Sequence, residues 1–429
     1  MNKVVCIFIS FILAACVDGY ENAHYQFIRD FENGNYQEAQ NIMQQNTVDI
    51  GKDIYLGGLQ CGTATLWTTQ QDNMCFDVAG AVLKNPEIDD SEYKMKDFEH
   101  IMLKTYVGIQ ELQNASANIK QTLNQAYSLQ VQNVQNNDDD IYEAQQKLKE
   151  YYDSVPGLPN IDDIVHSIDA ELSVQSDIVV PMKDYVNPYT TYLFALWDSL
   201  NGDKNNGYNY LKRVEKFVPD NKFIASDRNA IESGKNYVWV FFENGLVGQI
   251  KTRFLAPQIL QSFDIRLSVP DVFPGSLALP EIEIKTENDN VVKTEFLASI
   301  DSVLKTDFDK YKTANIIKSV GFELAKTAAA ITAGVGVGHA IRKHDKNTGN
   351  NIGLLVGMFI MNVEKDWDLR SWDSLPSQIQ IARIEMPKNR MLDINGITVK
   401  IQEDIRNAAV FVRIPKYGAK PGIIVGKLN

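Results

Sequence analysis

The sequence has few of the residues from which metal and redox centres are built. It contains 4 cysteines and 5 histidines in 429 residues, and the histidines show no metal-ligand spacing. It also has neither a Gly-x-Ser-x-Gly elbow nor a His-Glu-x-x-His motif, which mark α/β-hydrolases and zinc proteases. We therefore expect no metal, no cofactor and no enzymatic activity. A glycosidase-like pair of carboxylates stays open, because acidic residues are abundant and nothing singles out two of them.

The sequence also has fewer basic than acidic residues. Lys and Arg number 42 against 55 Asp and Glu, which gives a formal net charge of −13. Nucleic-acid binding needs clustered cations for phosphate contacts, so we expect no nucleic-acid partner. An acidic body is likewise repelled by anionic lipid headgroups, so surface charge does not explain any attachment to a membrane.

The N-terminus carries a short export signal. Lys3 precedes an uncharged run, Val4 to Leu13, that is far shorter than the roughly 20 residues needed to span a bilayer. Leu13-Ala14-Ala15-Cys16 then has the small-residue pattern of a bacterial lipobox. We expect residues 1–15 to be a signal peptide and Cys16 to become the N-terminus, carrying acyl chains, palmitate among them. The alternative is an ordinary secretory signal that ends near a cysteine.

Several acyl chains on one cysteine attach a protein durably to a membrane. Val17, and not an aspartate, directly follows Cys16, and in Gram-negative bacteria an aspartate there retains lipoproteins at the inner membrane. We therefore expect an outer-membrane lipoprotein whose body faces the periplasm.

Two cysteines, Cys61 and Cys75, remain as a candidate pair in that oxidising compartment. If a helical hairpin turns near Gln71, the two lie about 9 Å apart along the helix axis, which is too far for bridging geometry. We expect buried thiols here, with a disulfide as the alternative.

The chain from residue 16 to 155 is expected to be a helical, repeat-like domain. Residues 156–187 follow as a connector, and 188–235 as a further repeat-like hairpin. Apolar residues recur at helical spacing, as at Ala23, Phe27 and Phe31. A pattern of an aromatic residue and a small packing residue then repeats, and the residues expected to pack the repeats are Tyr36, Ala39, Phe76, Ala79, Gly207 and Pro219.

These positions resemble the tetratricopeptide repeat, a 34-residue helix–turn–helix with a central small residue and a terminal proline. The spacing here is longer, and Gly207 stands where that repeat has alanine. The resemblance implies an array of helical pairs. The competing interpretation is an irregular helical bundle.

Residues 236–429 are expected to form an α+β domain. Tyr237 to Phe242 is a β-branched and aromatic run with Gln249 to Leu255 as its expected partner strand, and Ala408 to Ile414 pairs back onto the first strand. Helix is expected from Phe296 to Ile341. Small apolar residues with repeated glycines between 325 and 363 favour a buried helical pair, with a membrane-inserting hairpin as the alternative.

One segment of this domain, residues 366–376, is dense in Trp, Arg and Asp. Trp367, Asp368, Arg370 and Trp372 form either a sugar-stacking or carboxylate-binding site, or a structural corner with buried tryptophans and a local ion pair. We favour the corner.

Together with residues 187–219 and 237–245, this segment resembles a functionally uncharacterised family of bacterial lipoproteins. The resemblance implies a lipoprotein architecture and no established activity. Our leading hypothesis is a non-catalytic scaffold or regulator of a cell-envelope assembly that binds envelope proteins. The alternative is an envelope glycan-binding protein or hydrolase that uses the segment from Trp367 to Trp372.

Overall fold

The computed structural model describes residues 19–68, 74–89, 93, 95–136, 138–153, 159–182, 186–263, 266–287, 290–332 and 368–429. Within these ranges, a region of about 11 packed helices (20–232) precedes a mixed α/β region with sheets (237–427). The fold class expected from the sequence is therefore confirmed. Cys16 and Trp367 lie outside the described residues, as do the glycines between 334 and 338.

The helices of the first region pack mainly against their neighbours in sequence, as in the pairs α2–α3, α4–α5, α6–α7 and α10–α11. One helix, α9, lies in the stretch expected to be a connector. The helices are α2 (Gly19–Glu32), α3 (Tyr36–Met43), α4 (Ile54–Leu66), α5 (Met74–Lys84), α6 (Asp97–Gln113), α7 (Ile119–Asn136), α8 (Asp138–Asp153), α9 (Ile161–Ser173), α10 (Pro188–Leu200), α11 (Lys204–Glu215) and α12 (Lys222–Glu232), with short turns of helix η1 (Gln44–Val48) and η2 (Pro86–Ile88).

In its described residues, the second region has three sheets and two helices. The strands are β1 (Tyr237–Asn244), β2 (Gln249–Leu255), β3 (Leu267–Phe273), β4 (Glu283–Lys285), β5 (Val291–Lys293), β6 (Glu295–Ser299), β7 (Gln378–Glu385), β8 (Met391–Ile394), β9 (Ile397–Lys400), β10 (Ala408–Ile414) and β11 (Gly422–Lys427). The helices are α13 (Ile300–Asp309) and α14 (Lys312–Thr332), with a short turn η3 (Gln258–Phe263). Phe296 lies in β6, so the helical stretch begins at Ile300 and the earlier start expected from the sequence is wrong.

The central sheet has the strand order β11-β10-β1-β7-β6. β1 pairs in parallel with β10, Val238 opposite Ala408, so the end of the chain returns to the first strand as expected. The expected β1–β2 hairpin is wrong, because β10 and β7 occupy both edges of β1 and β2 pairs with β3 instead. Gly245, at φ +73°, turns the chain away from the sheet, and Leu246 then pairs with Ser276.

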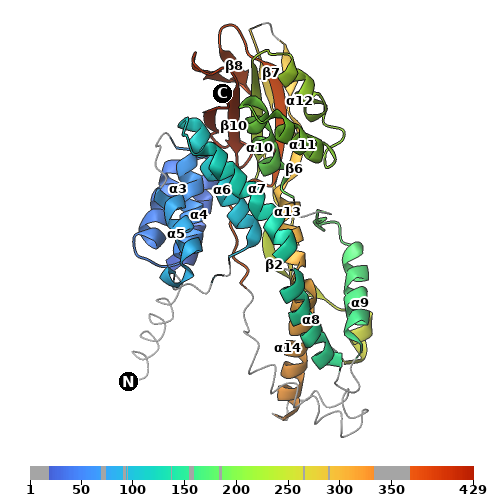
Figure 1. Ribbon diagram of the computed structural model, residues 1–429. Helices are drawn as coiled ribbons and strands as arrows, with labels where there is room; N and C mark the ends of the chain where they lie inside the picture. Colours follow the sequence, from blue (N-terminus) through green and yellow to red (C-terminus); the bar gives the residue numbers. More distant parts are fainter. Residues whose placement is uncertain are drawn as a thin grey trace, which may run out of the picture.

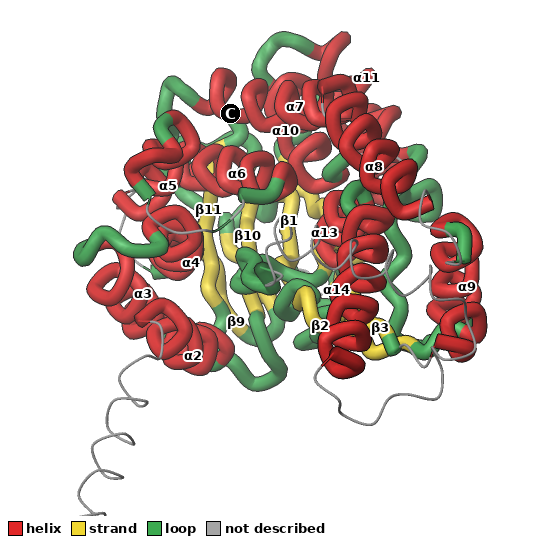
Figure 2. Tube along the Cα trace, turned by 90° about the horizontal axis from the view of Figure 1, so that it is seen from below, coloured by secondary structure: helices red, strands yellow, loops and turns green. Residues whose placement is uncertain are grey.

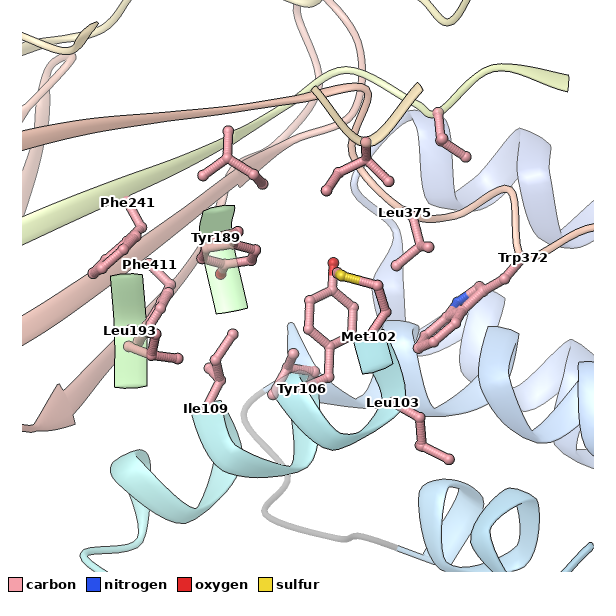
Figure 3. Close-up of a cluster of buried hydrophobic side chains, with 14 of the residues drawn as sticks. Met102, Leu103, Tyr106, Ile109, Tyr189, Leu193, Phe241, Trp372, Leu375 and Phe411 are labelled. Carbon is pink, nitrogen blue, oxygen red and sulfur yellow. The ribbon is translucent and has the colours of Figure 1, made fainter. Parts of the chain in front are cut away.

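The two faces of this sheet have different coverings. On β1, Trp239 and Phe241 face a core shared with the helices, while Val240 and Phe242 face the small sheet β5-β4-β8-β9. Figure 2 shows α6 and α10 lying across the strands. Figure 3 shows the shared core, where Tyr106 of α6 lies between the sheet and Trp372. Because this core joins residues from both regions, the helical layer and the sheet stabilise each other.

A third core lies in an arm made of α8, α9, α14 and the β2–β3 ribbon, which extends below the sheet in Figure 1. Its buried residues come from distant parts of the sequence, among them Ile164, Leu267 and Ile317. Within the described ranges, no helix is long and apolar enough to cross a membrane.

Cys61 and Cys75 form a disulfide with their Cα atoms 5.8 Å apart, so the expectation of free buried thiols is wrong. The expected distance of about 9 Å between the two cysteines along the helix axis assumes a tight turn at Gln71. In the structure, α4 ends at Leu66 and α5 begins at Met74, so the two helices are not joined by a tight turn. Glycines on α4 also bring the helices together, since a Cβ on Gly58 would lie 2.9 Å from the Cys75 carbonyl oxygen.

Candidate functional site

The tryptophan-containing segment singled out by its composition lies where the helical region meets the central sheet. Its described part runs from Asp368 to Ser377, just before β7. Residues of α2, α4 and α6 contact it, and we call this group of contacts the polar corner.

Trp372 is the centre of the polar corner. Its side chain is fully buried, and its ring meets those of Tyr106 and Phe76 edge to face at centroid distances of 5.6 and 6.2 Å. The indole Nε1 donates to Thr63 Oγ1 at 2.8 Å and to Ser374 Oγ at 3.1 Å. A buried ring offers no face to a sugar, so this placement is that of a structural corner.

Glu99, at the start of α6, accepts a hydrogen bond from the backbone of Trp372. The Trp372 N–H donates to Glu99 Oε1 at 3.1 Å, and Tyr93 Oη–H donates to the same carboxylate. The Glu99 Oε2 atom also accepts from the Lys96 N–H at 3.2 Å, which caps the helix. Burial raises the pKa of Glu99, although Lys96 and these donors oppose the shift.

Arg370 joins the segment to the helices at the partly exposed rim of the corner. Its guanidinium makes two bonds of 2.9 Å to Asp368 and one of 2.7 Å from Nη1 to Asp53 Oδ1, just before α4. It also lies 5.4 Å from the ring centre of Tyr93. The hydrogen bond to Asp368 raises the pKa of Arg370, so the guanidinium stays charged.

Asp373 links the segment to α2 and α4. Gln60 Nε2 donates to its Oδ1 at 2.6 Å, and His24 Nε2 lies 2.9 Å from its Oδ2. Burial alone would lower the pKa of His24, but the charge and hydrogen bond of Asp373, with Glu21 nearby, raise it overall. The pair is therefore an ion pair at mildly acidic pH.

These contacts determine what the corner can do. Glu99, Trp372 and Ser374 are completely buried and hydrogen-bonded to one another or to neighbouring helices. A substrate therefore cannot reach them without opening the fold. The chemistry that the geometry supports is the attachment of the helical region to the sheet.

The sequence singled out Asp368, Arg370 and Trp372, and the structure pairs Asp368 with Arg370 at the rim and buries Trp372 beneath it against the helices. Their partners His24, Asp53, Lys96, Glu99 and Asp373 were missed as site residues. His24 lies within the apolar stripe of Ala23 and Phe27, and Asp53 lies just before a helix, so local patterns place each of them in an ordinary structural role. The residues meet only in the fold, with 349 positions between His24 and Asp373.

The residues expected to pack the repeats all lie in the helical region. Ala39 and Ala79 are fully buried, and a Cβ on Gly58 would lie 3.2 Å from the Ala79 Cβ. Tyr36 donates to the Arg413 carbonyl oxygen at 3.3 Å, and Phe76 contacts Trp372. Gly207 on α11 packs against Ser199 of α10, whereas Pro219 is exposed between α11 and α12.

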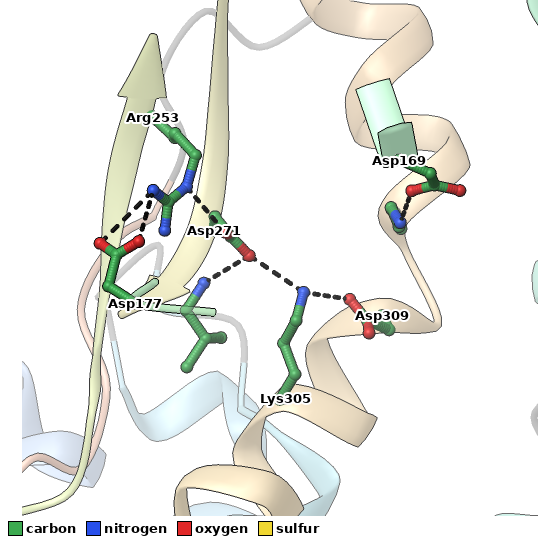
Figure 4. A network of polar contacts seen from close by, with 8 residues as sticks. Asp169, Asp177, Arg253, Asp271, Lys305 and Asp309 are labelled. Atoms are coloured by element: carbon green, nitrogen blue, oxygen red, sulfur yellow. Dashed lines mark hydrogen bonds and ion pairs between the residues drawn. The ribbon is translucent and has the colours of Figure 1, made fainter. Parts of the chain in front are cut away.

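A second polar network joins the arm to the rest of the molecule (Figure 4). Asp271 on β3 accepts from Arg253 Nε at 3.0 Å and from Lys305 Nζ at 2.9 Å, and all three side chains are buried. Lys305 also donates to Asp309 at 2.6 Å, and Arg253 contacts Asp177 at 3.1 Å. The network fixes the β2–β3 ribbon against α13.

Among the residues that the structure describes, no group of three or more His, Cys, Asp or Glu side chains is arranged to hold a metal ion. Comparison of the chain with protein-family models, with curated proteins and with solved structures finds no match.

Proposed function

We propose that this protein is a lipoprotein of the bacterial cell envelope, anchored to the outer membrane through acyl chains on Cys16, with its body in the periplasm. In this proposal it acts as a non-catalytic scaffold or regulator of an envelope assembly by binding other proteins. The observation that carries the location is the Cys61–Cys75 disulfide, because structural disulfides form in oxidising compartments. The lipobox at Cys16 supplies the anchor.

The polar corner supports a scaffold over an enzyme. Its acidic, basic and hydroxyl groups are paired with one another, and they are buried except at the partly exposed rim around Arg370, as expected of residues that hold the fold together. The alternative of a glycan-binding protein or hydrolase draws less support, because Trp372 is buried.

The arm is the surface that best fits the binding of a partner. The inner side of the helical layer is filled by the central sheet, so the described helices offer no free concave face there. On the arm, by contrast, Val174 and Phe254 are each 80 % exposed, more than any other large apolar side chain in the described ranges. Exposed apolar residues on a projecting element are typical of protein-binding sites.

The experiment is cross-linking in living cells, followed by purification from membranes and identification of the bound proteins. Three versions are compared: the wild type, Phe254→Asp on the arm, and Tyr417→Asp as a control with a similarly exposed side chain of 79 %. We expect a small set of envelope proteins with the wild type and with Tyr417→Asp, and their loss with Phe254→Asp. Recovery of cell-wall fragments without protein partners would contradict a scaffold and favour the glycan-binding alternative.

A Cys16→Ser version, soluble in the periplasm, tests the role of the anchor. We expect it to fold and to lose the envelope partners, because it no longer concentrates at the membrane.

A further inference from the structure

The N-terminal helix begins very close to the proposed lipid attachment site. α2 starts at Gly19, three residues after Cys16. Even fully extended, this spacer spans only about 11 Å. An acylated Cys16 lies at the bilayer surface, so the first turn of α2 is held next to the lipid headgroups.

Two loops lie at the same end of the helical pairs as that first turn. Arg370 connects the loop at residues 49–53 to the first turn of α2, since it contacts Asp53 at 2.7 Å and lies 6.0 Å from the ring centre of Tyr20. Asp89 accepts hydrogen bonds from the backbone N–H groups of Ile54 and Tyr55, at 3.2 and 2.9 Å. The first turn of α2, loop 49–53 and turn 85–89 therefore form one surface, which we call the anchor end.

The opposite ends of the same helices are covered by the sheet. A Cβ on Gly34, in the α2–α3 turn, would lie 2.2 Å from the Lys420 carbonyl oxygen, and Trp67 at the end of α4 packs on Gly422. Of the two described ends of these helices, the anchor end is therefore the one directed away from the central sheet.

Each loop of the anchor end exposes an isoleucine. Ile50 is 58 % and Ile88 is 45 % exposed, and both lie in short turns with charged neighbours. Among the exposed residues described at the anchor end and at the end of α5, Lys52 and Lys84 are accompanied by three carboxylates, those of Glu21, Asp49 and Glu87. The body as a whole is strongly acidic, so this nearly balanced end is repelled less by anionic lipids than the rest of the surface would be.

We propose that the anchor end is seated on the bilayer, with Ile50 and Ile88 in the lipid interface, so that the protein stands on the membrane in a defined orientation. This inference rests on the proposed acylation of Cys16. Apolar side chains in surface loops enter the interface by removing apolar area from water, and the short tether keeps them close enough to do so.

The test uses the full-length acylated protein in vesicles of phosphatidylethanolamine and phosphatidylglycerol that contain nitroxide-labelled lipid. A polarity-sensitive fluorophore is attached to single cysteines in Ile50→Cys and Ile88→Cys. The control is Met74→Cys at the other end of α5, where the native side chain is 39 % exposed. Cys61 and Cys75 are held in their disulfide and do not compete for the label.

We expect lipid-borne nitroxide to quench the probes at 50 and 88 about threefold more than the probe at 74, because only the first two reach the interface. Adding Ile50→Asp to the variant labelled at 88 should reduce its quenching while the protein stays on the vesicles. Equal, weak quenching at all three positions in vesicle-bound protein would overturn this inference and leave the proposed anchoring intact.

Other outcomes identify other occupants of this surface. Protein that does not float with the vesicles would overturn both the anchoring and the inference. Disulfide-linked dimers through positions 50 and 88, without quenching by lipid, would show that a second copy covers the anchor end and would also overturn the inference.

Discussion

His24 on α2 lies 2.9 Å from the carboxylate of Asp373, which follows the buried Trp372 near the other end of the chain. This contact ties the first helix of the helical region to the segment that leads into the central sheet. Since the pKa of His24 is raised in the folded protein, the histidine takes up a proton on folding near neutral pH.

The first prediction concerns the pH dependence of this pair. For a raised pKa, the stabilisation is complete below the ordinary histidine value of about 6.5 and is lost as the pH rises through the folded-state value. His24→Gln should therefore lower the free energy of unfolding by about 1 to 3 kcal/mol near pH 6, and by much less near pH 9. Urea unfolding of the soluble Cys16→Ser form measures this. A loss that is the same at both pH values, or larger at pH 9, would contradict the ion pair.

The second prediction concerns the disulfide. Cys61 and Cys75 are separated by 14 positions, and for a loop of this length a disulfide contributes about 3 kcal/mol by restricting the unfolded chain. Cys61→Ala with Cys75→Ala should lower the free energy of unfolding by about this amount, measured in urea. Thiol-specific alkylation of the native protein should modify neither cysteine until a reductant is added. Immediate labelling would show that the bond is absent.

The third prediction tests the close approach of α10 and α11. A Cβ on Gly207 would lie 2.6 Å from the Ser199 backbone nitrogen and 2.8 Å from the Ala195 carbonyl oxygen. Gly207→Ala should therefore destabilise the protein by about 1 to 3 kcal/mol, because the backbone must move.

The matched control is Gly80→Ala on α5, where nothing lies within 4 Å of the added Cβ. This change should stabilise the protein by about 0.5 to 1 kcal/mol through helix propensity. Thermal unfolding midpoints of the two variants should shift in opposite directions, and a shift in the same direction would contradict the packing described for Gly207.

The fourth prediction separates the structural corner from a glycan-binding site. Trp372→Ala should cost about 3 to 5 kcal/mol, because it leaves a cavity beside Tyr106 and removes the donor to Thr63. Tyr417→Ala, at an exposed site, should change stability by less than about 0.5 kcal/mol. If Trp372→Ala kept full stability and lost binding to cell-wall fragments, the glycan-binding interpretation would replace the corner.

The fifth prediction concerns the attachment of the arm. Lys305→Met removes one charged donor from the buried carboxylate of Asp271, which keeps Arg253 as its partner, and the loss of such a hydrogen bond costs about 1.5 to 3 kcal/mol. We expect limited proteolysis to cut the β2–β3 ribbon earlier in this variant than in the wild type. Unchanged cleavage would show that the network does not hold the ribbon.

Local patterns in the sequence predicted much of the fold. The helical spacing of Ala23, Phe27 and Phe31 corresponds to α2, and the β-branched run from Tyr237 corresponds to β1. The return of the last strands to β1 was also predicted, because two groups of strands flank a helical stretch and the run from Ala408 to Ile414, apolar except for Arg413, is typical of a buried strand.

Pairings between distant residues could not be predicted from the sequence. The partner of β1 depends on which strands fill its edges, and the turn at Gly245 sends the nearest candidate, β2, to β3. The disulfide could not be predicted because its geometry depends on how α4 and α5 pack, with α4 ending at Leu66 and α5 beginning at Met74. His24 and Glu99 gave no local sign of a site, because their partners lie near the other end of the chain.

The most direct test of the proposed anchoring is mass spectrometry of the N-terminal peptide of the protein purified from outer membranes. We predict that this peptide begins at Cys16 and carries the mass of attached acyl chains. An unmodified peptide, from protein found in the soluble periplasmic fraction, would contradict the lipid-anchored scaffold and, with it, the seating of Ile50 and Ile88 on the membrane.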